Sequence, residues 1–312
     1  MSQVGWDQIG WYRDPETVGR LVSEIASVGA FSQDAQMAWR GMRSIDYALI
    51  SSLHRFIPDA DEAQLRREEK RTLREAREWG LGSSTSGWST DLQLLADLQH
   101  FGTSTRLLDV TSNPMTALWF AAQQLSDQEL NDGFSEDGVL LAINVAGWRR
   151  FGRTPPRSFR ENARPLSWEL SDALASQEPF VVEAHVGNDR LRAQEGFFIS
   201  SVVPGQDPRS PFRSIRLDLP HTTGSLANMA LHHVQDALER EELPPRFLEK
   251  GLSAIPFMAF HVRASTKLRI RDILRNSYNR SPAVLFPDFA GFREFAESAR
   301  PRTSPQDTDA PR

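Results

Sequence analysis

The sequence predicts an α+β protein in which a central, mostly antiparallel sheet is flanked by helices. Two observations lead to this class. Strand-like runs cluster between residues 138 and 219, and helix-like periodicity lies both before them, up to residue 124, and after them, from residue 226. With 312 residues, the chain is long enough to bury a substantial core.

The first part of the chain is expected to supply helices and one strand. Residues 15–28 have the apolar spacing of an amphipathic helix, and residues 31–40 predict a strand that ends at Arg40. Residues 61–79 predict a charged helix with a thin apolar stripe. Residues 81–89, rich in Gly, Ser and Thr, predict a loop.

The segment from 91 to 124 concentrates polar residues between two predicted helices. The first helix covers 91–99, and the second, nearly all apolar, covers 114–124 after candidate capping residues at 111–113. The loop between them is rich in hydroxyl and charged groups, namely Thr103, Ser104, Thr105, Arg106 and Asp109. Because the second helix is expected to be buried, Arg106 and Asp109 are expected to pair with each other or with groups near Arg40.

The remaining elements follow from shorter patterns. Four further strands are expected, at 138–145, 180–184, 191–203 and 211–219. Mainly helical segments are expected after them, at 226–241, 244–260 and 265–276. The last residues, from 299 or 300 to 312, are rich in Pro, Ser, Thr and Asp and predict a disordered tail.

Composition excludes several function classes. The net charge is −5, so no global field attracts nucleic acid. The absence of cysteine excludes disulfides and thiolate metal sites, and the seven histidines show no ligand spacing, so no metal is expected. The sequence shows neither a secretory signal pattern nor an apolar run long enough for a membrane span. A soluble cytoplasmic protein without membrane partners is therefore expected.

Four blocks resemble the motifs of FRG-domain proteins. Trp39-Arg40-Gly41 resembles the signature that names the family, with Trp in place of Phe, and it is followed by 49–55. The central block comprises 99–102, 105–109 and 117–121, and the later blocks are 192–198 and 285–288. The resemblance runs from Trp39 to Phe295. It implies an N-terminal helical segment at 1–30, an FRG domain at 31–298 and a tail at 299–312.

The FRG pattern is in turn similar to that of ADP-ribosyltransferases of the Arg-Ser-Glu type. The resemblance therefore implies an ADP-ribosyltransferase-like fold and NAD as a substrate. It implies the following NAD-binding residues: Arg40, Gly41, His100, Thr103, Ser104, Thr105 and Arg106. An arginine fork suits a phosphate, and hydroxyl groups suit a carboxamide. The implied catalytic residues are Gln194, Glu195 and Asp109.

One position departs from the transferase pattern. The catalytic Glu of that pattern stands two positions after the first Glu or Gln, and here that position is Gly196. If residues 191–199 form a strand, Gln194 and Glu195 point to opposite faces, so only one of them can face the pocket. The motif favours Gln194, with a carboxylate elsewhere, such as Asp109, completing the chemistry.

Three functions remain open from the sequence. The leading one is an NAD-dependent toxin or phage-defence effector that modifies a macromolecule, nucleic acid or protein, with an antitoxin as a further partner. The second is a non-catalytic module that binds a nucleotide or a partner segment. The third is a nucleic-acid-binding protein that uses two arginine clusters, at 149–164 and 263–280.

Overall fold

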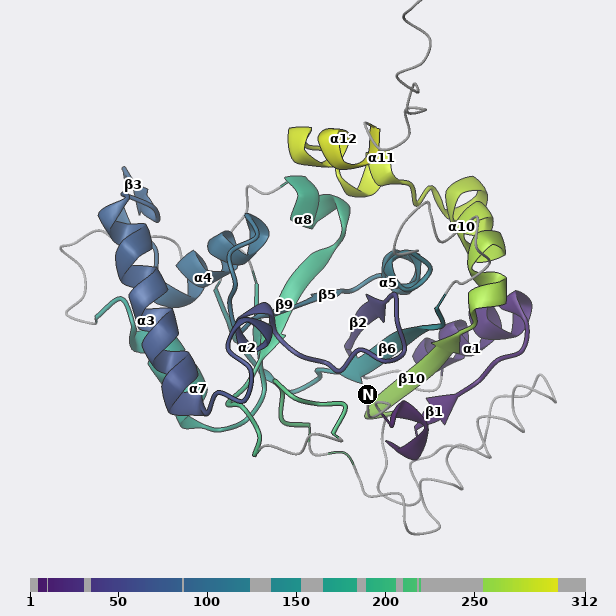
Figure 1. The fold of residues 1–312 in the computed structure, drawn as a ribbon, viewed down its shortest axis with the longest axis horizontal. Helices are drawn as coiled ribbons and strands as arrows, with labels where there is room; N and C mark the ends of the chain where they lie inside the picture. The colour runs from purple at the N-terminus through teal and green to yellow at the C-terminus, as the bar shows by residue number, and fades with distance from the viewer. Residues whose placement is uncertain are drawn as a thin grey trace, which may run out of the picture.

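The computed structural model describes residues 5–9, 11–30, 35–85, 87–123, 136–152, 165–183, 189–205, 210–217, 219 and 255–296. One eight-stranded sheet organises this part of the chain, in the order β1-β10-β6-β2-β5-β9-β8-β7 (Figure 1). Only the β1–β10 and β7–β8 pairs are parallel, so the predicted mostly antiparallel sheet is confirmed. The strands of this sheet are β1 (Tyr12–Arg13), β2 (Met37–Met42), β5 (Leu108–Thr111), β6 (Gly138–Asn144), β7 (Arg149–Phe151), β8 (Phe180–Val182), β9 (Gly196–Ser200) and β10 (Phe257–Val262).

Helices flank both halves of this sheet, which confirms the α+β class (Figure 1). Near the β1-β10-β6-β2 half lie η1 (Trp6–Ile9), α1 (Val18–Ala30), α5 (Pro114–Ala121) and α10 (Ala264–Tyr278). Near the β5-β9-β8-β7 half lie α2 (Ser52–Phe56), α3 (Glu62–Glu78), α4 (Asp91–His100), α7 (Trp168–Ala175) and α8 (Asp189–Ala193). The C-terminal helices are α11 (Pro282–Leu285) and α12 (Phe289–Ala296).

The sheet has a narrow join at its centre. Strands β2 and β6 pair along six residues, from Met37 opposite Asn144 to Met42 opposite Val139. Strands β2 and β5, by contrast, pair only at Trp39 and Thr111. We call this junction the seam. It divides the sheet into two four-stranded halves that are joined at Trp39 and Thr111.

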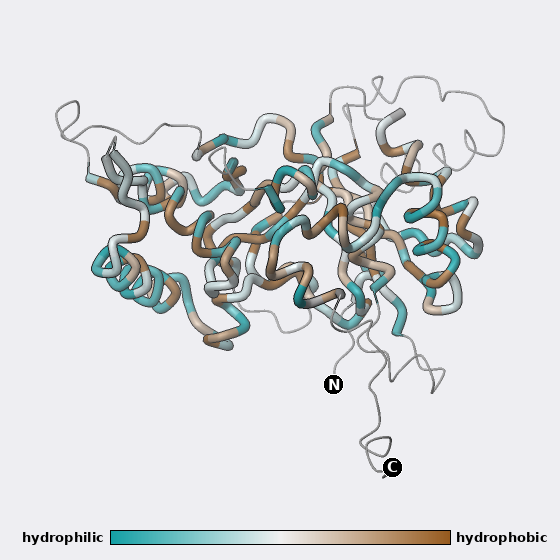
Figure 2. Tube along the Cα trace, turned by 90° about the horizontal axis from the view of Figure 1, so that it is seen from above, coloured by the Kyte–Doolittle hydropathy of each residue, from teal (hydrophilic) through white to brown (hydrophobic). Residues whose placement is uncertain are grey.

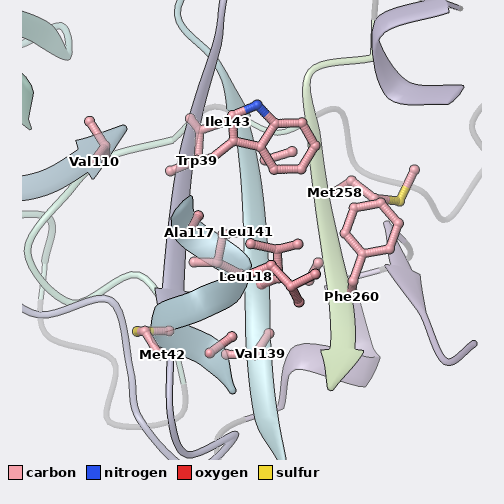
Figure 3. Packing of buried hydrophobic residues seen from close by; sticks show 14 of the residues in the cluster. Trp39, Met42, Val110, Ala117, Leu118, Val139, Leu141, Ile143, Met258 and Phe260 are labelled. Carbon is pink, nitrogen blue, oxygen red and sulfur yellow. The ribbon is translucent and has the colours of Figure 1, made fainter. Parts of the chain in front are cut away.

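Helix α5 packs very close to the sheet because two glycines lie beneath it. A Cβ atom on Gly41 would stand 1.8 Å from the carbonyl oxygen of Ala117, and one on Gly138 would stand 2.4 Å from that of Ala121. Apolar side chains of α5, β2, β6 and β10 surround this contact and form the main core (Figure 3). Gly41 is therefore required by packing, and the position of α5 fixes the end of β2 that carries Arg40.

Hydropathy follows this layout. Helix α3, at the far left, is largely hydrophilic, and its apolar residues Leu65 and Leu73 are buried (Figure 2). A capping box fixes its start, because the side chains of Asp61 and Gln64 each accept the other residue's backbone N–H. None of the helices in the described part of the chain combines the length and the apolar character needed to span a membrane.

Several sequence expectations need correction. The expected strand over 191–203 begins only at Gly196, because residues 189–193 form α8. No strand forms among the described residues of 211–219, where Phe212 makes a single bridge to Leu49. The end of the expected helix over 244–260 is strand β10. The expected loop over 81–89 contains a short hairpin, β3 (Ser83–Ser84) and β4 (Gly87–Trp88).

The other expected elements agree with the structure or cannot be compared with it. The helices predicted at 15–28, 61–79, 91–99, 114–124 and 265–276 are confirmed as α1, α3, α4, α5 and α10, with shifted ends. The strands predicted at 138–145 and 180–184 are confirmed as β6 and β8. The expected helices at 226–241 and 244–254 and the expected tail lie outside the described residues.

Candidate functional site

A cavity of about 750 Å³ lies at the seam. Its walls come from β2, the end of α4, strand β5, the α8–β9 turn and the start of α12. Helices α8, α11 and α12 lie together at the top of Figure 1, beyond the ends of β5 and β9. Residues of all four motif blocks line the cavity, among them Arg40, Asp109, Gln194 and Asp288. Segments far apart in the sequence thus form one site.

Arg40 lies next to the seam residue Trp39 on β2. Its Nη1 donates a hydrogen bond to the backbone oxygen of Asp109 on β5, so this side chain bridges the two halves of the sheet. Its Nε is buried and has no hydrogen-bond partner in the described structure. Burial lowers the pKa of Arg40, and the Asp109 carboxylate opposes this effect. A guanidinium that lines a cavity and keeps an unused donor is able to hydrogen-bond an anion.

A chain of hydrogen bonds fixes the Asp109 carboxylate. Its Oδ2 accepts a hydrogen bond of 2.8 Å from Nε2 of Gln99. The Gln99 oxygen in turn accepts from the hydroxyl groups of Thr105, at 2.7 Å, and Ser52, at 3.3 Å. Because both hydroxyl groups occupy the Gln99 oxygen, the amide must present its NH₂ group to Asp109. The exposed Asp109 side chain is therefore held as an acceptor at the cavity.

Gln194 and Glu195 lie in a turn between α8 and β9. Gln194 lines the cavity, and its Nε2 donates to the backbone oxygen of Leu285 at 3.0 Å. Glu195 has a left-handed φ of 51° and an exposed side chain. Its carboxylate accepts from Asn113 at 2.9 Å and pairs with Arg280 at 2.8 Å. The expected inward position of Gln194 agrees with this geometry, but strand alternation is not its cause.

Three further charged or titratable side chains line the cavity. Arg190 on α8 stacks its guanidinium over the Phe286 ring, 4.3 Å from the ring centre. Burial lowers the pKa of His100, and the nearby Arg190 lowers it further, which favours the neutral imidazole. Asp288 uses its Oδ1 to accept the backbone N–H of Gly291 at the start of α12. Of the two lining carboxylates, Asp109 is exposed and Asp288 is half-buried.

Arg106 does not pair with Asp109, so that expectation is wrong. Arg106 is buried and makes a two-pronged ion pair with Glu69 of α3, with a second pair to Glu62 at 3.0 Å. Burial lowers the pKa of Arg106, but the Glu69 carboxylate outweighs this effect and raises it overall. Asp109 was also expected to pair with a group near Arg40. It does so only through its backbone oxygen, which accepts a hydrogen bond from Arg40. Arg106 serves the α3 interface.

The expected nicotinamide-pocket residues have mixed positions. Thr103 and Ser104 are half-buried in the loop before β5 and are not among the cavity-lining residues, and Thr105 is fully buried beneath Gln99. Gly41 lines the cavity beside Arg40. Of the residues expected to bind NAD, the structure brings Arg40, Gly41 and His100 together at the cavity. It places Thr105 behind the cavity wall.

Several cavity residues were missed as site candidates. Gln99, Phe101 and Asp288 stand inside motif blocks, so their presence there was the available signal. Arg190 and Phe289 stand just outside the blocks, and no local pattern distinguishes them from surface residues. Their role depends on the packing of α8 and α12, which are close in space and about a hundred residues apart in sequence.

The arginine clusters carry counter-ions in the described part of the chain. Arg149 pairs with Asp172 at 2.5 Å, Arg150 with Glu183 at 2.8 Å and Arg263 with Asp14 at 2.9 Å. Residues 153–164 lie outside the described residues. The arginines that can be placed are thus partly neutralised by their neighbours, which weakens the attraction they offer to a polyanion.

Fold and site together define an α+β protein with a cavity of charged, polar and aromatic side chains at the seam of a divided sheet. The chain contains an FRG domain: the family model of that description matches residues 35–130. The match includes Arg40 and Asp109, and the other two cavity blocks lie beyond it. Comparison with curated proteins and with solved structures gives no match.

Proposed function

We propose that the seam cavity binds NAD and that the protein is an ADP-ribosyltransferase-like effector, a toxin or phage-defence protein acting in the cytoplasm on a macromolecule. One observation carries the proposal. Arg40, with donors left unused, and Asp109, held as an acceptor, meet in one cavity across the seam. The Arg40 guanidinium can donate hydrogen bonds to a phosphate group, and the Asp109 carboxylate can accept them from ribose hydroxyl groups.

The size and lining of the cavity support a nucleotide. A volume of about 750 Å³ falls within the usual range for cofactor and ligand sites, roughly 300–1,000 Å³. The lining combines apolar and aromatic groups with few charged ones, which include Arg40, Arg190, Asp109 and Asp288. Two cations suit a diphosphate, and the carboxylates suit the sugars on either side of it.

The proposed reaction uses Asp109 as its carboxylate. The bond between the ribose carbon and the nicotinamide nitrogen breaks, and neutral nicotinamide leaves with the bonding electron pair. A nucleophilic group of the acceptor then bonds to that carbon and gives up its proton. Asp109 stabilises the positive charge that develops on the sugar and accepts the proton. The Gln99 hydrogen bond keeps the carboxylate oriented for this role.

Substitution of Arg40 tests the site. Arg40→Ala should weaken NAD binding about 10- to 150-fold, because a hydrogen bond to a charged group contributes about 1.5–3 kcal/mol. Isothermal calorimetry measures the affinity, and Arg74→Ala, on the exposed surface of α3, is the matched control. Equal NAD affinities for Arg40→Ala and the wild type would remove Arg40 from the binding site.

A non-catalytic nucleotide-binding module is the second candidate, and one observation favours it. Glu195 is exposed and held by Arg280 and Asn113, while Gly196 occupies the position expected for a catalytic Glu. Incubation with NAD and total cell extract separates the candidates. Release of nicotinamide and labelling of the extract, both lost in Asp109→Asn with binding retained, indicate the transferase. Retention of NAD without release indicates the binding module.

A further inference from the structure

We infer that the rings of Phe101 and Phe289 form a stacking site for an adenine-type base at the mouth of the cavity. The inference rests on the proposed function and specifies which part of the nucleotide lies at the mouth. Both residues line the cavity, yet their relative exposures are 84% and 95%. Neither ring can be covered by the other at such exposures, so both rings have free faces beside the cavity.

The other aromatic rings of the lining are already engaged. Trp39 and Phe198 are buried in the core, and Trp39 stacks on Phe260. Phe120 makes edge contacts with Trp119 and Phe286, at centroid distances of 5.1 and 6.1 Å. Among the described phenylalanine and tryptophan rings that line the cavity, only those of Phe101 and Phe289 are largely exposed.

Both rings stand on well-fixed backbone. The Phe101 N–H donates to the Asp97 oxygen at the end of α4, and the His100 ring meets the Phe101 ring edge-on at 4.9 Å. Phe289 begins α12, whose start is capped by Asp288. A Cβ atom on Gly291 would stand 2.3 Å from the Cβ of Phe286, so α12 packs tightly against α11. A fixed backbone limits the entropy that is lost when a base stacks on these rings.

The polar groups near the mouth also suit a purine nucleotide. Arg40 and Arg190 lie in the same cavity and can hold the phosphates that follow the base. The neutral His100 imidazole and the Asp288 carboxylate can accept hydrogen bonds from an exocyclic amino group. The cavity would thus be filled from the mouth in the order base, diphosphate and second sugar, which reaches Asp109.

Fluorescent etheno-NAD tests the stacking site alone, because stacking on aromatic rings quenches the etheno-adenine, whose blocked exocyclic nitrogen cannot donate to His100 or Asp288. Phe101→Ala and Phe289→Ala should each reduce the quenching and weaken affinity about 5- to 150-fold, the range for loss of one base–aromatic contact. Phe292→Ala is the matched control, since Phe292 lies on the same helix, is 61% exposed and is not among the lining residues. Nicotinamide mononucleotide, which lacks adenine, should bind all four proteins equally.

The outcomes separate this inference from the proposed function. Wild-type binding of etheno-NAD with unchanged quenching in both variants overturns the stacking site and leaves NAD binding intact. Equal losses for etheno-NAD and the mononucleotide overturn it as well, because the rings would then not read the base. Tight binding of etheno-ADP without binding of NAD sinks the proposed function alone. A change of oligomeric state in the variants, with quenching retained, assigns the rings to a second copy of the chain.

Discussion

At the scale of single residues, two arginines of the motif blocks have opposite environments. Arg106 is saturated by the carboxylates of Glu69 and Glu62 and by the backbone oxygen of Ser201. Arg40 has a neutral acceptor, the Asp109 oxygen, and a buried Nε without a partner in the described structure. The same side-chain type therefore has all its donors engaged in the fold at one position and keeps a donor unused beside the cavity at the other.

Glu69→Ala should destabilise the protein by about 3–5 kcal/mol, because it leaves the buried Arg106 guanidinium without its main counter-ion. Urea unfolding measures the effect. Glu68→Ala, one residue away on the exposed face of α3, is the control and should cost about 1 kcal/mol or less. Similar unfolding midpoints for Glu69→Ala and Glu68→Ala would show that the Arg106 pair contributes no more than a surface pair.

The sequence located Arg40 and Gln194 at the site but assigned Arg106 to the wrong partner. Motif blocks identify residues that share a site, and Arg40 and Gln194 belong to such blocks. They do not identify a partner 37 positions away on a charged helix, where Glu69 resembles its solvated neighbours. Sequence proximity therefore favours Asp109, the nearest opposite charge, although Asp109 lies on β5 and lines the cavity.

At the scale of elements, periodicity failed where an element was short or entirely buried. Helix α8 has five residues, too few to show a helical repeat, so residues 191–203 were predicted as one strand. Strand β10 is apolar on both faces and pairs with β6 in the core, so its pattern could not be told from that of a buried helix. The longer amphipathic helices, such as α3, were predicted closely because they have one solvated face.

Helix α10 is joined to its neighbours by a buried lysine. Lys267 donates from Nζ to the backbone oxygen of Arg43, after β2, at 2.7 Å, and to that of Gln123, after α5, at 3.4 Å. Burial lowers the pKa of Lys267 to about 8, although Asp137 opposes the shift. Unfolding restores the usual value of about 10.4. Between these two values the unfolded chain binds more protons, so Lys267 makes folding more favourable as the pH rises.

Lys267→Met should remove this pH dependence. The wild type should gain stability relative to the variant as the pH rises from 8 to 10, and the difference should be constant below pH 7. Urea unfolding at several pH values measures the difference, with Lys70→Met on the exposed face of α3 as control. The series should stop near pH 10. Burial raises the pKa of Tyr12 to about 12, so above pH 10 the unfolded chain loses the Tyr12 proton before the folded chain does, and the fold becomes less stable. Parallel pH curves for wild type and variant would contradict the assignment.

At the scale of the whole molecule, the class of the fold was predictable but the strand order was not. Local patterns located most helices and gave the α+β class. Strand order depends on contacts between distant residues, such as Tyr12 of β1 with Ala259 of β10. The seam belongs to the same category, because the short pairing of β2 with β5 leaves no mark on either strand's sequence. The sequence could therefore indicate which residues share a site, but not where in the sheet the cavity lies.

The narrow seam has a consequence for cooperativity. One residue pair of the sheet and the Arg40 side chain join the two half-sheets. The main apolar cluster, which includes Val110 and Ile199, crosses the seam, whereas a second cluster lies in the β5-β9-β8-β7 half alone, so that half should open in part independently of the other. A ligand that contacts both Arg40 and Asp109 would tie the units together. Amide hydrogen exchange with and without NAD should then show slower exchange in β6 of one half and β9 of the other. Protection confined to one half would mean that the ligand does not bridge the seam, and the halves would remain energetically separate.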